Sequence, residues 1–291
     1  MRVLILGGDG MLGHRLTAHL RPRHDVRVTL RRALGEYERF GLFHPGNAFP
    51  DVDVRNPARL DEVFGDFSPD AAVNCAGIVK QRSEPGLDVL SMEVNAIAPH
   101  LVARICRKHG ARLIHLSTDC VFSGKKGNYS EQDRPDPADV YGLSKLLGEP
   151  GGPGVLTLRT SMIGPELHRK TGLVEWFLAQ REKKAPVRGW RGAIFSGFTT
   201  AELSRILEKL LMGHPQAAGL YHASSASISK LDLLAGIERR LALGIAIEPA
   251  DEPRCDRSLD SSRFRSAFAY APPAWDVMLD ELAMELRELC A

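Results

Sequence analysis

The sequence predicts an α/β protein in which a doubly wound parallel sheet is followed by a smaller C-terminal lobe. Short apolar runs alternate with helical patterns over residues 1–160, and a glycine-rich turn directly follows the first run. After residue 160, prolines and glycines interrupt the pattern. Strand–helix repetition favours βαβ crossovers and a parallel sheet covered on both faces. We therefore expect one domain over residues 1–160 and, over residues 161–291, mostly a substrate-binding lobe with segments that return to the main sheet.

The individual elements follow from these patterns in chain order. Apolar or alternating runs predict strands at Val3–Leu6 and Val26–Leu30, a third strand before Asp51, and further strands at 70–75, 112–116 and 155–158. Helical patterns begin near Met11 and cover residues 90–109, and the lobe adds helices at 173–181, 200–212, 229–243 and 276–289. Ligands of such sheets bind at the carboxyl ends of the strands, so functional residues are expected at that edge.

The composition indicates a soluble globular protein. The 291 residues are 44% hydrophobic and 25% charged, with a formal net charge of +2. This charge is too balanced for nucleic acid or an anionic membrane to be the main partner. No uninterrupted apolar stretch approaches the roughly 20 residues that span a bilayer, and the apolar run at residues 2–6 is too short for a signal peptide. The five cysteines lack metal-ligand spacing, so we expect a cytoplasmic protein with free thiols and no metal site.

A glycine-rich turn after the first strand predicts a dinucleotide site. Gly7, Gly10 and Gly13 have the spacing G-x-x-G-x-x-G between a predicted strand and a predicted helix. Such a turn lets the backbone approach a pyrophosphate, and the free N–H groups of the helix N-terminus attract the anion. We expect this turn, with Met11 and Leu12 at the start of the helix, to bind the cofactor of a Rossmann-type domain. A glycine-rich turn without a ligand is the alternative.

Two arginines after the second strand indicate NADP rather than NAD. In such folds a carboxylate at this position bonds the ribose 2′-hydroxyl of NAD, whereas an arginine accommodates the 2′-phosphate of NADP. Arg31 and Arg32 stand there, so we expect NADP(H) to be preferred over NAD(H). A solvated basic pair is the alternative.

Residues after the third and fourth strands complete the expected cofactor site. Asp53, followed by Val54, would accept a hydrogen bond from the adenine amino group. The small residues of Cys75-Ala76-Gly77 would let the cofactor lie flat across the edge of the sheet. Asn95, in the following helix, is expected as a polar brace near the active site and as a substrate contact, with an exposed helix asparagine as the alternative.

Tyr141 and Lys145 carry the expected chemistry. Residues four apart on a helix share a face, so the lysine cation would lie near the phenol and lower its pKa from about 10. The tyrosine would then exchange a proton with a substrate oxygen near neutral pH. Ser117 or Thr118, at the end of the fifth strand, would hydrogen-bond that oxygen. We predict an NAD(P)-dependent enzyme that acts on a carbonyl or alcohol, with a surface tyrosine–lysine pair as the alternative.

At these residues the chain resembles the extended short-chain dehydrogenases/reductases, and within them the dTDP-4-dehydrorhamnose reductases. The segment Ser117-Thr118-Asp119-Cys120-Val121-Phe122-Ser123-Gly124 resembles the family pattern S-T-D-Y-V-F-x-G. The resemblance continues through Tyr141-Gly142-x-Ser144-Lys145-x-x-Gly148-Glu149 and Leu158-Arg159-Thr160-Ser161. It covers residues 1–165 well and the rest more loosely.

The resemblance implies a catalytic set of Thr118, Tyr141 and Lys145. NADPH would deliver a hydride to the C4 ketone of a dTDP- or UDP-linked deoxysugar, and Tyr141 would supply the proton. Tyr141 and Lys145 would also contact the cofactor, with the lysine on the nicotinamide ribose. The hydride chemistry belongs to the cofactor, whereas the protein supplies orientation and electrostatics.

Two departures from the family pattern fall on the sugar side of the expected pocket, beside Asp119. Cys120 stands where the rhamnose enzymes carry tyrosine, and Met162 stands where they often carry tryptophan. Both changes remove aromatic surface, and the first also removes a hydroxyl. The resemblance therefore implies a related keto-sugar nucleotide more than the rhamnose precursor itself.

Two other functions remain open on the same scaffold. Sugar-nucleotide dehydratases place a second carboxylic acid where this chain has Cys120, and epimerases keep NAD bound, which fits Arg31 and Arg32 poorly. A non-catalytic NADP-binding regulatory subunit is the second alternative, because a fold does not dictate a function. Such a subunit would not need the whole catalytic set.

A few further residues carry weaker expectations. Lys80-Gln81-Arg82 would meet a substrate phosphate or lie in a solvated loop, and Trp176 is expected in the core. Arg263 lies in a segment that resembles the closing loop of the family, without an assigned role. We also expect a nucleotide-sugar substrate, no nucleic-acid or membrane partner, and a homodimer as an open alternative to a monomer.

Overall fold

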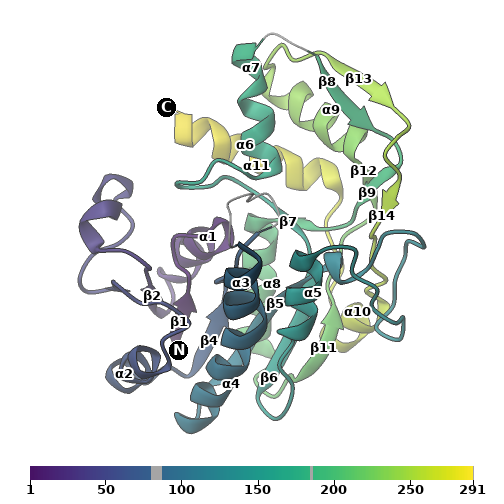
Figure 1. The fold of residues 1–291 in the computed structure, drawn as a ribbon. Helices are drawn as coiled ribbons and strands as arrows, with labels where there is room; N and C mark the ends of the chain where they lie inside the picture. Colours follow the sequence, from purple (N-terminus) through teal and green to yellow (C-terminus); the bar gives the residue numbers. More distant parts are fainter. Residues whose placement is uncertain (80–86, 184–185, 291) are drawn as a thin grey trace.

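The computed structural model describes residues 1–79, 87–183 and 186–290, and a seven-stranded parallel sheet forms its centre (Figure 1). The strands follow the order β11-β6-β5-β4-β1-β2-β3. They are β1 (Arg2–Leu6), β2 (Asp25–Thr29), β3 (Ala48–Phe49), β4 (Ala71–Asn74), β5 (Arg112–Thr118), β6 (Val155–Thr160) and β11 (Gly219–His222). The expected doubly wound parallel sheet is confirmed. The strand order reverses between β1 and β4, which places the ligand crevice of this architecture at their carboxyl ends.

Helices cover both faces of the sheet. On one face α1 (Met11–Leu20) packs against α8 (Thr200–Gly213), and the other face carries α2 (Pro57–Phe67) and α4 (Ala98–Lys108). The residues of β1 alternate between two apolar cores. Val3 and Ile5 belong to the core under α1, whereas Leu4 and Leu6 belong to the core under α2 and α4. This is the pattern of a strand that is buried on both sides.

One long helical segment runs from residue 87 to residue 108. It consists of α3 (Leu87–Ser91), a π-helical turn η2 (Met92–Ile97) and α4. By length and composition, these 22 residues would be long and apolar enough to cross a membrane, which differs from the sequence expectation. Half of the most apolar window is buried inside the fold, and the segment contacts α2 and α5 (Val140–Leu147). A core helix passes the same test of length and composition.

The smaller lobe contains short strands and helices with their own apolar core. Its paired strands are β8 (Val187–Trp190) with β13 (Ile247–Ala250), and β9 (Ala193–Phe195) with β12 (Ile228–Ser229) and β14 (Cys255–Asp256). Its helices include α6 (Leu173–Leu178), α7 (Gln180–Lys183), α9 (Lys230–Leu241) and α11 (Trp275–Cys290). The remaining elements are η1 (Leu34–Phe40), η3 (Asp119–Val121), β7 (Met162–Ile163), β10 (Phe198–Thr199) and α10 (Ser262–Phe268).

Two segments from the C-terminal part of the chain return to the main sheet. β11 pairs in parallel with β6, and α8 packs on α1. The smaller lobe lies above the sheet in Figure 1, and these returning segments interrupt it in sequence. The division of the chain at residue 160 stays a prediction.

Trp176 corrects one expectation about the core. Its side chain is 41% exposed, whereas the neighbouring Phe177 is fully buried. Val174 and Phe177 lie three residues apart in α6 and share the face that packs into the core of the smaller lobe. The intervening Trp176 therefore points toward solvent.

Candidate active site

The glycine turn after β1 is shaped by close backbone approaches. Gly7 has a φ of +80°, and a Cβ atom there would lie 3.0 Å from the backbone of Ala76. A Cβ atom on Gly13 would lie 2.1 Å from the carbonyl oxygen of Gly7, so α1 approaches the turn only without a side chain. Gly10 caps α1 without a side-chain hydrogen bond. The first N–H groups of this helix are therefore available to an anion, which fits the phosphates of a dinucleotide.

Two adjoining cavities open beside this turn. The larger has a volume of about 300 Å³ and lies between the main sheet and the smaller lobe. Its wall includes the sequence-predicted residues Gly10, Met11, Leu12, Cys75, Ala76, Gly77, Thr118, Asp119, Cys120, Tyr141, Lys145 and Met162. The smaller, of about 100 Å³, includes the predicted residues Gly7, Gly10, Arg31, Asp53, Val54, Cys75, Ala76 and Gly77. The shared residues show that the cavities meet at the glycine turn.

The smaller cavity contains an acidic residue that already has a partner. The Asp53 carboxylate accepts a hydrogen bond from Arg55 Nη2 at 2.7 Å, and Arg55 Nη1 donates to Glu93 at 2.6 Å. Hydrogen bonds from Arg55 lower the pKa of Asp53, which keeps the carboxylate charged at neutral pH. Sequence analysis missed Arg55, although it lies two residues after Asp53 and also lines this cavity.

The two arginines after β2 point in different directions. Arg31 lines the smaller cavity. Arg32 instead donates to the Glu36 carboxylate at 2.7 Å, and 58% of its side chain is exposed. The structure therefore places one arginine at the cavity where the sequence analysis expected two.

Thr118, Tyr141 and Lys145 meet on the wall of the larger cavity. Thr118 ends β5, and the other two lie one turn apart in α5. The helix comes this close to the strand because Gly142 lacks a side chain. A Cβ atom at this glycine would lie 2.2 Å from the carbonyl oxygen of Cys120. A glycine in the Tyr-x-x-x-Lys segment is thus a condition for the geometry of the site.

The pKa of Tyr141 is raised in this structure, opposite to the direction expected from the sequence. Burial raises the pKa of the Tyr141 phenol above its ordinary value. Lys145 Nζ donates to the carbonyl oxygen of Leu116 at 2.6 Å, and burial lowers the pKa of this lysine to about 8. The buried phenol is therefore neutral and protonated at pH 7, which is the form required of a proton donor.

Asn95 is a structural link and does not line either cavity. Its side chain is 1% exposed, accepts from the N–H of Ile78 at 2.9 Å and donates to the carbonyl oxygen of Ile78 at 3.0 Å. The same amide donates to Ser144 Oγ at 3.2 Å. Both polar atoms are thus occupied, so the expected substrate contact is not supported. Asn95 braces α5 against the loop that follows β4, which agrees with the other expectation for this residue, a polar brace.

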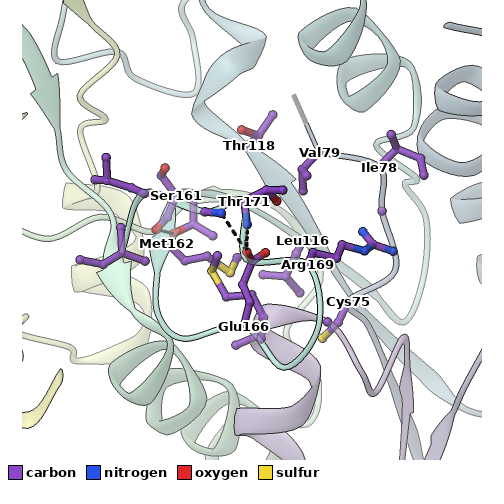
Figure 2. Close-up of a pocket in the computed structure, with 18 of the residues that line it drawn as sticks. Cys75, Ile78, Val79, Leu116, Thr118, Ser161, Met162, Glu166, Arg169 and Thr171 are labelled. Atoms are coloured by element: carbon purple, nitrogen blue, oxygen red, sulfur yellow. Dashed lines mark hydrogen bonds between the residues drawn. The ribbon is translucent and has the colours of Figure 1, made fainter. Parts of the chain in front are cut away.

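A loop from the smaller lobe closes part of the larger cavity, and sequence analysis missed it. Glu166 accepts hydrogen bonds from the backbone N–H groups of Thr171 and Gly172, at 2.6 and 2.8 Å (Figure 2). Arg169 extends from this loop toward the side where Cys75 lies, and it lines both cavities. Nothing in the loop sequence matched a motif, and only its position after Leu158-Arg159-Thr160-Ser161 could have indicated it.

The wall next to Thr118 combines an acid and a thiol. Asp119 and Cys120 follow this threonine directly, and Thr118 Oγ1 donates to Asp119 at 3.2 Å. Burial raises the pKa of Asp119, and burial raises the pKa of Cys120 to about 12, so the thiol stays protonated. Met162, at the start of β7, and Lys230, at the start of α9, line the same cavity.

Three further sequence expectations concern the loop after β4, Arg263 and a metal site. Lys80, Gln81 and Arg82 lie outside the described residues, so their predicted phosphate contact stays a prediction. Arg263 donates to the carbonyl oxygen of Leu220 at 3.2 Å and lies over the Tyr221 ring, which assigns it a structural role. Within the described ranges, no group of three or more histidine, cysteine, aspartate or glutamate side chains could hold a metal ion.

Replacing Lys145 by methionine is expected to stabilise the protein at neutral pH. Burial shifts the pKa of Lys145 from 10.5 to about 8, which corresponds to about 3 kcal/mol of destabilisation while the amine is charged. This destabilisation is fully present at pH values below the pKa that Lys145 has in the folded protein, about 8. Between the two pKa values the unfolded chain binds more protons than the folded protein, so the stability of the parent protein rises with pH there.

Urea unfolding of the parent protein and of Lys145→Met, at about pH 7 and about pH 10, measures this effect. We expect the variant to be at least as stable as the parent at the lower pH and to lose that advantage at the higher pH. A variant that is clearly less stable at neutral pH would show that the hydrogen bond to Leu116 outweighs the burial of the charge.

The fold and the site define an NAD(P)-dependent oxidoreductase of the extended short-chain dehydrogenase/reductase class. The glycine turn lies at the switch point of a doubly wound sheet, and the Tyr-x-x-x-Lys pair faces the same cavity. Residues 1–288 match the model of the RmlD substrate binding domain, and the chain belongs to that family.

Individual relatives agree with this assignment. A dTDP-4-dehydrorhamnose reductase from Aggregatibacter actinomycetemcomitans is 27% identical, over 97% of this chain and 98% of its own. A solved dTDP-4-dehydrorhamnose reductase from Bacillus anthracis, in complex with NADP, superposes with a TM-score of 0.79 at 23% identity, over 98% of this chain and 99% of its own. The Bordetella bronchiseptica enzyme WbmG, in complex with NAD, reaches 0.81 at 21% identity, over 99% and 94%. The family resemblance and the fold expected from the sequence are confirmed.

Proposed function

We propose that this protein uses NADPH to reduce the C4 ketone of a dTDP- or UDP-linked deoxysugar. The observation that carries the proposal is that Thr118, Tyr141 and Lys145 meet in one cavity that also includes the glycine turn. The curated relative named dTDP-4-dehydrorhamnose reductase supports the reaction type. Cys120 and Met162 favour a keto-sugar related to the rhamnose precursor.

The residues of the chain act on the ketone oxygen. NADPH, when bound, supplies the hydride. The Thr118 hydroxyl and the Tyr141 phenol would both donate to the oxygen as negative charge develops on it, and the phenol would transfer its proton. Burial keeps that proton on Tyr141 until the charge appears. Lys145 would bind the nicotinamide ribose, and its hydrogen bond to Leu116 fixes its position at the cavity wall.

The direct test follows NADPH oxidation by absorbance with a panel of dTDP- and UDP-linked 4-keto-6-deoxysugars. Oxidation with any member of the panel, and little oxidation with NADH, would support the proposal. If NADPH binds but no member of the panel is reduced, the substrate is another carbonyl compound or the protein is a non-catalytic NADP-binding subunit.

An epimerase or dehydratase of the same fold is distinguished by its cofactor content. Such enzymes retain NAD through the catalytic cycle, whereas a reductase exchanges its cofactor after each turnover. We expect the supernatant of the purified, denatured protein to contain no stoichiometric NAD. A one-to-one content of NAD would favour an epimerase or dehydratase over a reductase.

We propose that Arg31 sets a preference for NADPH over NADH. Arg31 lines the smaller cavity, where the 2′-phosphate would lie. Removing a charge-assisted hydrogen bond costs about 1.5–3 kcal/mol, so Arg31→Ala should weaken NADPH binding by about 10- to 150-fold and change NADH binding little. Arg32→Ala is the matched control, because this side chain pairs with Glu36 outside the cavity. Equal losses for both variants, measured by fluorescence titration, would contradict the assignment.

The location of the protein in the cell and its oligomeric state are two further proposals. We propose a cytoplasmic location, since the soluble cofactor and a nucleotide sugar would both be found there. A homodimer would bury exposed apolar side chains on neighbouring helices, among them Val89, Ile97, Leu143 and Leu147. Light scattering of the purified protein decides between a dimer and a monomer.

A further inference from the structure

Lys230 places a cation in the substrate cavity that the proposed reaction does not use. It is the first residue of α9 and lines the larger cavity together with Asp119, Cys120 and Phe195. The smaller lobe thus contributes a positively charged side chain to the same cavity that Thr118 lines. The catalytic set approaches the same cavity from the main sheet and α5.

The ammonium group of Lys230 lacks a counter-ion at contact distance. Across residues 1–79, 87–183 and 186–290, no carboxylate lies within 4.0 Å of it and no oxygen accepts a hydrogen bond from it. Its Nζ atom lies 4.6 Å from the centroid of the Phe195 ring. Burial lowers the pKa of Lys230, and the charge of Asp119 offsets part of that change from a greater distance.

A purely structural role does not account for this arrangement. A cation–π contact contributes about 0.5–2 kcal/mol, which offsets only part of the hydration that an ammonium group loses when its side chain is largely buried. Lys145, the other lysine on this wall, has the carbonyl oxygen of Leu116 as an acceptor. Lys230 has no such acceptor in the described part of the chain, so the missing partner is expected from a ligand.

We propose that Lys230 binds an anionic oxygen of the nucleotide-sugar substrate and thereby selects substrates that present one to this wall. The inference rests on the proposed function, because it takes the ligand to be a nucleotide sugar. Two groups of a nucleotide sugar carry the required chemistry. The diphosphate is present in every substrate of the proposed reaction, whereas the C6 carboxylate occurs only in a uronic acid sugar, which would then replace the 6-deoxysugar as the substrate. Either would form a charge-assisted hydrogen bond with the ammonium group.

Binding measurements on the NADP-loaded protein separate the two sources. Calorimetric titrations of the parent protein and of Lys230→Met would use UDP, UDP-glucose and UDP-glucuronate, with dTDP and dTDP-glucose in parallel. If Lys230 meets the diphosphate, the variant should bind every probe about 10- to 150-fold more weakly. If it meets a sugar carboxylate, UDP-glucuronate alone should lose affinity. Equal affinities of the two proteins, within about twofold, would overturn the inference.

Three controls keep the result specific. Lys209→Met removes the same charge from an exposed side chain on α8 that donates to the carbonyl oxygen of Ala269, and it should change no nucleotide affinity. Lys230→Arg should restore part of the affinity, because it retains a cation. Lys230→Met and Lys230→Gln should melt no lower than the parent, since the contact with the Phe195 ring is lost together with the buried charge that it only partly offsets. Lower melting temperatures for both would assign a structural role and overturn the inference.

The test also separates this inference from the function on which it rests. If the parent protein binds the probes and Lys230→Met binds them equally well, only the role of Lys230 is rejected. If the parent protein binds NADPH but none of the nucleotide probes, the proposed function fails, and the role of Lys230 fails with it.

Discussion

Tyr141→Phe should lower kcat for ketone reduction by about 10²- to 10⁴-fold, the usual contribution of a general acid, and leave NADPH affinity nearly unchanged. The substitution removes one hydroxyl from the cavity wall and keeps the ring. Most of the expected cofactor contacts come from the glycine turn, Arg31 and the segment Cys75-Ala76-Gly77. Stopped-flow measurement of single-turnover NADPH oxidation separates the chemical step from cofactor binding.

The pH dependence of reduction provides a second test of the same group. Because burial raises the pKa of Tyr141, the phenol keeps its proton well above neutral pH. The rate of reduction should therefore show no loss from this group between about pH 7 and about pH 9. A tyrosine whose pKa is lowered by a neighbouring cation would instead lose its proton, and the rate would fall across that range.

A matched tyrosine controls for the removal of a hydroxyl. Tyr221 packs its ring on Phe268, and it lines neither of the two cavities at the glycine turn. Tyr221→Phe should turn over like the parent protein. If Tyr141→Phe also turned over like the parent, another group would have to supply the proton, and the catalytic set would need to be reassigned.

The fold, and the pair Tyr141 and Lys145 on one wall of a cavity, were accessible from the sequence because both depend on local patterns. In the glycine turn, Gly7 and Gly13 are required by backbone sterics that no other residue type satisfies. Tyr141 and Lys145 share a helix face through their spacing alone. The apolar runs of the sheet strands are equally local. Such features can be predicted without knowing which residues pack against them.

The features that sequence analysis missed depend on long-range packing. The pKa of Tyr141 follows from burial, which a helix pattern does not report. Arg31 and Arg32 are adjacent and chemically identical, but in the folded chain Arg32 pairs with Glu36 whereas Arg31 lines the smaller cavity. Lys230 reaches the cavity because α9 packs its N-terminus against β9, far away in sequence. For Asn95 the sequence analysis expected both a polar brace and a substrate contact; the structure shows the brace, to Ile78 and Ser144, because the side chain is buried within η2.

A buried ion pair between Glu149 and Arg159 lies near the candidate active site, and we expect its disruption to destabilise the protein strongly. Glu149 follows α5, and its carboxylate accepts from Arg159 Nε and Nη2, each at 2.8 Å. The side chains of Arg159 and Glu149 are 4% and 11% exposed. Ser117 Oγ donates to the same carboxylate at 2.6 Å, and the Arg159 guanidinium lies over the Phe122 ring. Glu149 therefore links β6, through Arg159, to the end of β5, through Ser117, which directly precedes Thr118.

Glu149→Ala should lower the free energy of unfolding by about 3–5 kcal/mol, because it leaves a buried guanidinium without its counter-ion. Removing Glu36, whose pair with Arg32 is exposed, should cost at most about 1 kcal/mol. Urea unfolding of both variants gives the comparison.

The double variant Glu149→Ala/Arg159→Met separates the loss of the pair from the burial of an unpaired charge. Replacing a buried ion pair by apolar side chains is often neutral, so the second substitution should recover most of the stability lost in Glu149→Ala. If the losses were additive instead, the damage would come from packing around Phe122 and Ser117. If Glu149→Ala alone cost less than about 1 kcal/mol, the pair would behave like an exposed one, and water would have to reach the guanidinium.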